Sequence, residues 1–146
     1  MSMSEVRVAP VGVASDEILA ACHRLIPQLS SSSRPITLAE LTEIVEGEST
    51  VLFAARRGTE IVGLLTLVVF RIPTAVRAWI EDVVVDESAR GSGVGEALSR
   101  AALAEATRRG AKTVELTSRP SREAANRLYQ RIGFVRRDTN VYRYEV

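Results

Sequence analysis

The sequence of 146 residues has one cysteine, one histidine and no long hydrophobic run. A single cysteine excludes an internal disulfide, and these two residues cannot supply the usual ligands of a zinc site, so we expect no metal. The longest nearly continuous apolar segment, residues 61–70, is far too short to span a bilayer. The first five residues lack the basic and apolar regions of a signal peptide. These absences predict a cytoplasmic protein with no membrane partner.

An excess of charge of either sign is also absent. The 19 basic and 18 acidic side chains leave a formal net charge of +1, without a polybasic segment. Nucleic-acid binding relies on clustered positive charge, so we expect no nucleic-acid partner. Hydrophobic residues form 46% of the chain and charged residues 25%, as in ordinary globular proteins. With no visible linker or internal repeat, residues 1–146 are predicted to form one domain.

Capping signals and apolar patterns divide the chain into helices and strands. Thr37 and Glu40 form a capping box, which predicts a helix that ends at Gly47. Similar signals predict helices over residues 16–29, over 94–109, and from 120 or 121 to about 133. The predicted strands cover residues 5–11, 50–57, 61–70, 78–85, 112–118, 134–137 and 141–146.

The order of these segments is β-α-α-β-β-β-α-β-α-β-β. Short turns between strands give antiparallel hairpins, whereas a strand, a glycine-rich loop, a helix and a strand form a parallel crossover. We therefore predict an α/β fold of the α+β type, with a mixed, twisted central sheet of about seven strands and four helices on its two faces.

A glycine-rich loop follows the predicted strand at 78–85 and opens the next helix. It consists of Arg90, Gly91, Ser92, Gly93, Val94 and Gly95. Glycines permit a tight turn with backbone N–H groups pointing outward at a helix N-terminus, which favours a phosphate or pyrophosphate. The loop lacks the Gly-Lys-Ser/Thr ending of a P-loop and the glycine spacing of a dinucleotide-binding fingerprint. A plain strand-to-helix turn is the structural alternative.

Two motifs resemble the GNAT superfamily of acyl-CoA N-acyltransferases. Arg90, Gly93 and Gly95 fit the pyrophosphate-loop pattern Arg/Gln-x-x-Gly-x-Gly/Ala, and residues 128–134 fit the pattern Leu-Tyr-x-x-x-Gly-Phe. The predicted order of segments also matches this superfamily along the whole chain. The resemblance implies the GNAT fold, with a split between the fourth and fifth strands. It further implies an enzyme that transfers an acetyl group from acetyl-CoA directly to a primary amine of a small molecule or a protein.

The resemblance also implies where acetyl-CoA binds. Its pantetheine arm would pair with the backbone of Val83, Val84 and Val85, and its pyrophosphate would bind residues 90–95. A backbone N–H of Val84 or Val85 would hold the oxyanion that develops on the thioester.

Two residues of the last helix have roles implied by the same resemblance. Tyr129 matches the general acid that protonates the leaving thiolate, with packing of the helix on the sheet as the alternative. Asn126 lies on the same helix face and would bind the pantetheine arm or a phosphate. The family's more usual asparagine position is held here by Arg122.

Glu81 and Asp82 interrupt an otherwise apolar strand. Carboxylates there are costly unless they are paired or reach a cleft. Because side chains alternate along a strand, only one of the two is expected to face the substrate. We predict Glu81 as the general base, and either carboxylate could bind an ammonium group or a sugar hydroxyl. An ion pair with Arg71 or Arg77 is the structural alternative.

Several alternatives stay open at this point. Residues 80–85 resemble the matching strand of glucosamine-6-phosphate N-acetyltransferases, so an amino sugar is one candidate acceptor. The family resemblance places the wall of the acceptor site within residues 18–47, which indicate no particular substrate. A GNAT-like module that senses acetyl-CoA or a metabolite without turnover, and a different nucleotide-binding domain, are alternative functions. A homodimer would use residues 140–145 as its pairing edge.

Overall fold

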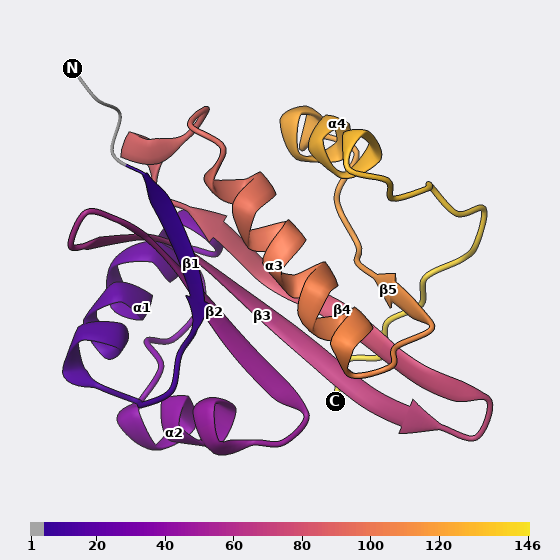
Figure 1. The fold of residues 1–146 in the computed structure, drawn as a ribbon, viewed down its shortest axis with the longest axis horizontal. Coiled ribbons are helices and arrows are strands. Elements are labelled where there is room, and N and C mark those ends of the chain that lie inside the picture. Colours follow the sequence, from indigo (N-terminus) through magenta and orange to yellow (C-terminus); the bar gives the residue numbers. More distant parts are fainter. Residues whose placement is uncertain (1–4) are drawn as a thin grey trace.

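The computed structural model describes residues 5–146 (Figure 1). The elements are β1 (Val6–Pro10), α1 (Asp16–Leu29), α2 (Leu38–Glu46), β2 (Thr50–Arg57), β3 (Glu60–Ile72), β4 (Ala75–Val85), the 3-10 helix η1 (Glu87–Ala89), α3 (Val94–Arg108), β5 (Thr113–Glu115) and α4 (Glu123–Arg131). The capping box of Thr37 and Glu40 is present at the start of α2. All four predicted α-helices are confirmed, with small differences at their ends.

One sheet runs through the molecule in the order β1-β2-β3-β4-β5. The first four strands are antiparallel to their neighbours, and β5 returns parallel to β4 after the α3 crossover. Helices α1 and α2 cover one face of this sheet and α3 covers the other (Figure 1). The mixed sheet with helices on both faces is therefore confirmed.

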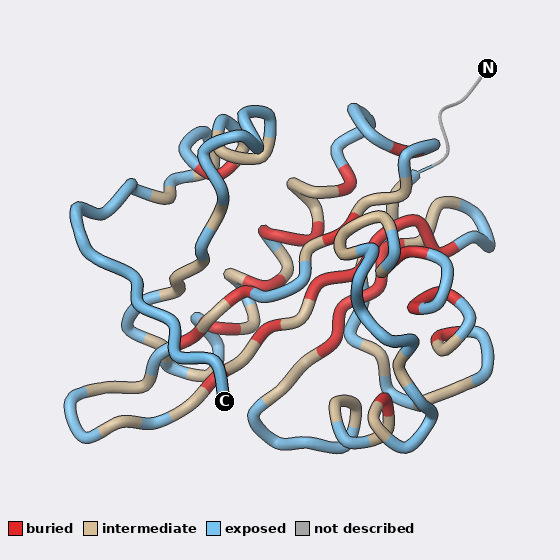
Figure 2. Tube along the Cα trace, turned by 180° about the vertical axis from the view of Figure 1, so that it is seen from behind, coloured by how far each residue is buried: buried red, intermediate tan, exposed pale blue. Residues whose placement is uncertain are grey.

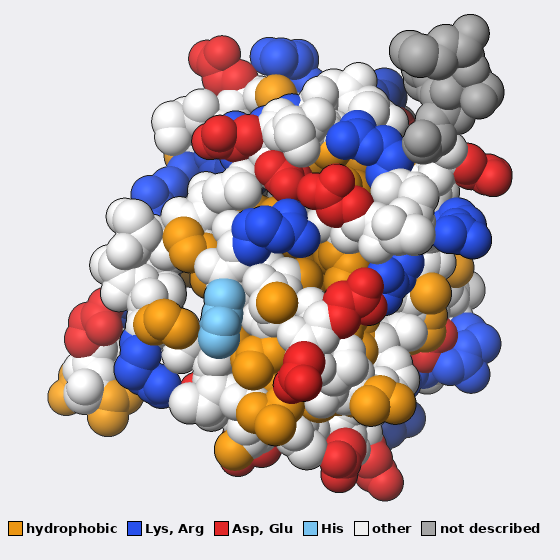
Figure 3. All heavy atoms as spheres, turned by 90° about the vertical axis from the view of Figure 1, so that its left-hand side faces the viewer, with side chains coloured by type: hydrophobic (Ala, Val, Ile, Leu, Met, Phe, Trp, Pro, Cys, Tyr) orange, Lys and Arg blue, Asp and Glu red, His pale blue; other side chains and the backbone are white. Residues whose placement is uncertain are grey.

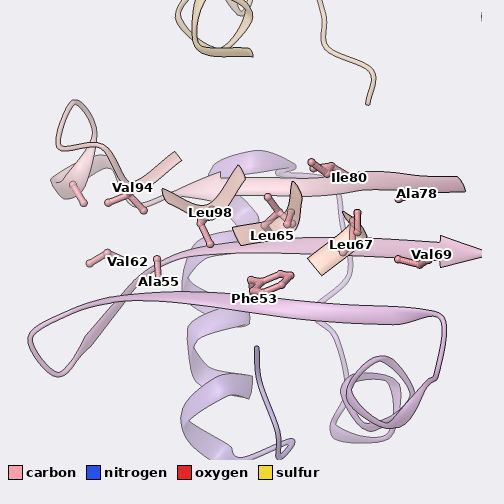
Figure 4. Packing of buried hydrophobic residues seen from close by; sticks show 13 residues of the cluster. Phe53, Ala55, Val62, Leu65, Leu67, Val69, Ala78, Ile80, Val94 and Leu98 are labelled. Atoms are coloured by element: carbon pink, nitrogen blue, oxygen red, sulfur yellow. The ribbon is translucent and has the colours of Figure 1, made fainter. Parts of the chain in front are cut away.

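The core beneath α3 fixes this helix on the sheet. Leu98 and Ala102 of α3 are fully buried, and they belong to one apolar cluster with Phe53, Leu65 and Ile80 of the strands (Figure 4). Burial of one such leucine contributes about 1.5–3 kcal/mol. This helix begins at the glycine loop, so the core also determines where the loop lies.

A second core holds α1 and α2 on the opposite face. Leu25 of α1 and Leu41 of α2 have no exposed surface, and they join a cluster with Leu52, Leu64 and Val84. The two helices are thereby held over β2, β3 and β4.

The two strands predicted at residues 134–137 and 141–146 are wrong. The residues after α4 form no strand, so the sheet has five strands rather than about seven. Val135, Val141 and Tyr142 are 84%, 73% and 87% exposed, and Figure 2 shows this segment running over the outside of the molecule. An alternating pattern becomes a strand only with a hydrogen-bonded partner. Here an ion pair of 2.8 Å between Arg137 and Glu115 connects the segment to β5.

Candidate active site

The edges of β4 and β5 separate after a short contact. All of β5, Thr113–Glu115, pairs with residues 77–79 of β4, so β5 is shorter than the predicted strand at 112–118. From residue 80 to residue 85, β4 has β3 on one side and no strand on the other. The split expected between the fourth and fifth strands is therefore present.

The direction of the β4 backbone determines which amides face this split. The Asp86 N–H donates to the Val62 carbonyl of β3 at 2.8 Å. The Val84 carbonyl also faces β3, since it lies 3.3 Å from the point where a Cβ on Gly63 would lie. Successive residues of a strand direct their peptide groups to alternate edges, so the N–H of Val85 faces the split and that of Val84 does not.

A β-bulge interrupts β4 at Asp82, whose φ of 50° lies in the left-handed region. The register between β3 and β4 shifts at this point, between Leu64 and Thr66 of β3. Ile80 before the bulge and Val83 after it both pack in the core beneath α3. Strict alternation would place these two residues on opposite faces, so the bulge adds one residue to the strand.

The bulge changes the expectation for the two carboxylates. Glu81 pairs with Thr66 of β3, and Glu81 and Asp82 both lie between Ile80 and Val83, whose side chains face α3. The side chains of Glu81 and Asp82 therefore both belong to the opposite face of the sheet, beneath α1 and α2. The prediction that only one would face this side is wrong, because the strand is not regular there. Both side chains are exposed, and neither forms an ion pair within residues 5–146. The alternative pairing with Arg71 or Arg77 is therefore not formed.

Asp82 lines a pocket between α1, α2 and the sheet, with a volume of about 230 Å³. Figure 3 shows the side of the molecule formed by α1 and α2, where hydrophobic side chains lie among acidic and basic ones. His23 Nε2 lies 2.7 Å from the carbonyl oxygen of Ile36, which ties α1 to the loop before α2. Ten of its fourteen lining residues fall within residues 18–47, the range in which the family resemblance places the wall of the acceptor site. No residue pattern indicated that Thr66 of β3 would line the same pocket.

The glycine loop lies between η1 and α3. Gly91 and Gly93 have φ values of 81° and 85°, a conformation in which glycine avoids the strain of a side chain. No side chain caps α3, so the N–H groups of its first turn are open to an external acceptor. Arg90 is exposed beside them. These features fit the predicted pyrophosphate site.

Gly95 has a different role, because it allows α4 to approach. A Cβ at this position would lie 3.3 Å from Leu128 Cδ2 and 3.8 Å from Val85 Cγ2. An ion pair of 2.9 Å between Glu96 and Arg131 joins the same two helices. The residues of α4 thus lie beside the end of β4 and the start of α3.

Tyr129 and Asn126 of α4 differ in their surroundings. Tyr129 is 7% exposed, and its ring centroid lies 5.7 Å from that of Phe134. Burial raises the pKa of Tyr129, against the opposing charge of Arg122, so the phenol is protonated at neutral pH. Asn126 Nδ2 donates a 3.0 Å hydrogen bond to the Arg119 carbonyl, which fixes the turn before α4. Only its amide oxygen is left for the predicted contact with a cofactor.

A polar cluster around Asp86 joins α1 to the end of β4. Its carboxylate accepts hydrogen bonds from Arg24 at 3.1 Å, from Gln28 at 3.5 Å and from the Ser88 N–H at 3.3 Å. Desolvation acts to raise the pKa of Asp86, but these hydrogen bonds and the charge of Arg24 lower it overall. The cluster links the pocket-lining helix to the glycine loop. Sequence patterns could not indicate it, because Arg24 and Gln28 are 62 and 58 residues away from Asp86.

Two further features are absent from residues 5–146. No group of three or more His, Cys, Asp or Glu side chains in this range is arranged to hold a metal ion. No helix in the described part of the chain has the length and apolar character needed to cross a membrane.

Comparisons with known proteins agree with this fold. No curated protein sequence matches the chain. A transcriptional regulator from Bacillus halodurans C-125 has a similar structure with a TM-score of 0.82 and 24% identity, over 97% of this chain and 100% of that one. An aminoglycoside acetyltransferase from an uncultured soil metagenomic sample, in complex with sisomicin, has a TM-score of 0.83 and 18% identity, over 97% of this chain and 95% of that one. Glucosamine-6-phosphate N-acetyltransferase from Arabidopsis thaliana has a TM-score of 0.77 and 17% identity, over 96% of this chain and 98% of that one.

At these low sequence identities, the structural similarities show the fold alone. The sequence itself matches the family model of the acetyltransferase (GNAT) family over residues 17–134, which includes the glycine loop and α4. The chain therefore belongs to the GNAT family of acetyltransferases.

Proposed function

We propose that this protein is an N-acetyltransferase that transfers the acetyl group of acetyl-CoA directly to a primary amine. The observation that carries this proposal is the unpaired edge of β4 from residue 80 to residue 85, which leads into the glycine loop. An extended pantetheine arm needs a strand edge with free peptide groups, and a pyrophosphate needs free N–H donors at a helix N-terminus. Both requirements meet here on consecutive segments.

Acetyl-CoA would lie along this edge. The backbone of residues 83–85 would bind the pantetheine arm, and the loop at 90–95 would bind the pyrophosphate, with Arg90 supplying positive charge. Asn126 would add a contact through its free amide oxygen. The N–H of Val85, directed into the split, would donate to the thioester oxygen as negative charge develops there.

The acceptor amine would approach from the face beneath α1 and α2. Glu81 and Asp82 would attract its ammonium form, and Glu81 would accept one proton so that the neutral nitrogen can attack the thioester carbon. The nitrogen would lose its second proton to water as the amide forms. The new C–N bond forms and the C–S bond breaks, so the sulfur leaves with the electron pair. Tyr129, protonated at neutral pH, would donate a proton to that thiolate.

Replacement of Tyr129 by Phe tests the proposal. The variant retains the ring and its contact with Phe134, so binding of acetyl-CoA, measured by calorimetry, is expected to stay within about twofold. Loss of a general acid typically costs about 100-fold or more in rate, which should appear in kcat for amine acetylation. An unchanged kcat would exclude Tyr129 as the general acid.

A thermal melt separates the proposed enzyme from its alternatives. Acetyl-CoA and desulfo-CoA should both raise the melting temperature by several degrees at saturating concentration, whereas ATP should not. Binding of CoA compounds without acetylation of any amine would instead indicate a sensing module. Stabilisation by ATP alone would favour a different nucleotide-binding domain.

A further inference from the structure

We infer that the acceptor of this enzyme is a small primary amine with a compact apolar substituent, rather than an aminoglycoside or a sugar phosphate. This inference rests on the proposed N-acetyltransferase function. It concerns the pocket that Asp82 shares with α1, α2 and the neighbouring strands.

The size of the pocket limits the acceptor. Its volume of about 230 Å³ lies below the roughly 300–1,000 Å³ typical of sites for drug-sized ligands. The sheet, two helices and the loop at 33–36 line the pocket, which is partly open to solvent. An amine with a side chain of a few carbon atoms fits within this space, whereas a molecule of several sugar rings would extend out of it into solvent.

The walls of the pocket are mainly aliphatic. Eight of its fourteen lining residues are isoleucine, leucine or proline. Ile26 of α1, Ile36 of the loop and Ile44 of α2 are only partly buried, so they offer apolar surface to a ligand. Removing such surface from water is favourable for an apolar substituent and brings no gain for hydroxyl groups that need hydrogen-bond partners.

The charges of the pocket fit one ammonium group and no phosphate. Asp82 is the only carboxylate among the lining residues, at the β4 wall where Glu81 precedes it. Arg34 is the only lining arginine, and it already forms a 2.8 Å ion pair with Glu40. His23 lies 2.7 Å from the Ile36 carbonyl oxygen. A phosphate would therefore have to displace Glu40 from Arg34, and a molecule with several ammonium groups would meet a single lining carboxylate, next to Glu81.

The test compares four acceptors with the intact protein and acetyl-CoA. Butylamine and 2-methoxyethylamine have the same number of non-hydrogen atoms, and an ether oxygen in the second replaces one methylene group of the first. We expect kcat/KM for butylamine to exceed that for 2-methoxyethylamine by about tenfold, the usual effect of one methylene in an apolar pocket. Both should be better acceptors than sisomicin and glucosamine 6-phosphate.

Two variants on α2 provide a matched comparison. Ile44→Gln places a polar group in the pocket and should reduce the preference for butylamine over 2-methoxyethylamine to about twofold or less. Leu38→Gln makes the same type of change at a position 46% exposed and outside the pocket, so it should leave this preference unchanged. Acetyl-CoA should bind both variants with the affinity of the original protein, which confirms that they are folded.

The outcomes distinguish two kinds of failure. If acetyl-CoA binds and sisomicin or glucosamine 6-phosphate is acetylated as well as butylamine or in its place, the inferred acceptor class is wrong. An unchanged preference in Ile44→Gln also contradicts the inference. If acetyl-CoA does not bind, or binds and none of the four acceptors is acetylated, the proposed function itself fails.

Discussion

Substitution of Gly63 by alanine should overpack the core beneath α3 and, through α3, weaken acetyl-CoA binding at the glycine loop. Its Cβ would lie 2.8 Å from Val94 Cγ1, closer than real Cβ contacts, and 3.0 Å from Leu98 Cδ1, so these side chains or the start of α3 must shift. Overpacking of this kind costs about 1–3 kcal/mol, against a gain of about 0.4–1 kcal/mol from the stiffer unfolded chain. The expected net loss is about 1–2 kcal/mol, or a melting temperature lower by about 3–8 °C.

Urea denaturation and calorimetric titration with acetyl-CoA measure the two effects. Val94 is the first residue of α3, so its displacement should also weaken acetyl-CoA binding through the glycine loop. Gly12→Ala is the control, since no heavy atom lies within 4 Å of its Cβ position and its φ is ordinary. If Gly63→Ala is as stable as Gly12→Ala, the close packing of α3 on β3 does not limit stability and the reasoning is refuted.

Three further predictions concern single side chains. Asp86→Asn should lower the free energy of unfolding by about 1 kcal/mol at pH 7. Because the folded-state pKa of Asp86 lies below 3.8, its stabilisation is present above that value, and urea denaturation should show the deficit disappearing as pH falls through the folded-state pKa. Thr37→Ala should cost about 1 kcal/mol through loss of the α2 cap, with Thr37→Ser retaining most of it, in the same assay. Because burial raises the pKa of Tyr129 above 10.0, the pH profile of kcat should show no loss assigned to this phenol below pH 10, and a decrease there that is absent in Tyr129→Phe would contradict the raised pKa.

The antiparallel part of the fold could be predicted because its signals are local. The capping box of Thr37 and Glu40 and the turn between β3 and β4 depend on residues close in sequence. The last two predicted strands failed because a short alternating segment forms a strand only beside a partner edge. Residues 134–146 have an ion pair to β5, but no ladder with it.

The candidate site was predictable where backbone conformation dictates residue type. Gly91 and Gly93 have positive φ values, and such positions select glycine strongly enough to be visible in one sequence. The bulge at Asp82 left no such mark, because aspartate is among the side chains that tolerate positive φ. The cluster around Asp86 could not be predicted, since it joins α1 to the end of β4, 62 residues away. For the pocket, the family resemblance indicated the range 18–47 of its wall, but not the residues of β2 and β3 that complete it.

The bulge in β4 allows two successive carboxylates to lie on the face beneath α1 and α2. A deletion of residue 81 or residue 82 would leave one residue between Ile80 and Val83, which is simple alternation, so residues 83–85 would keep their faces and their pairing with β3. The N–H of Val85 would still face the split, and a single carboxylate would remain on the other side of the strand. Relatives without the bulge should therefore keep the strand edge proposed for the cofactor and carry at most one acidic residue at this point of β4.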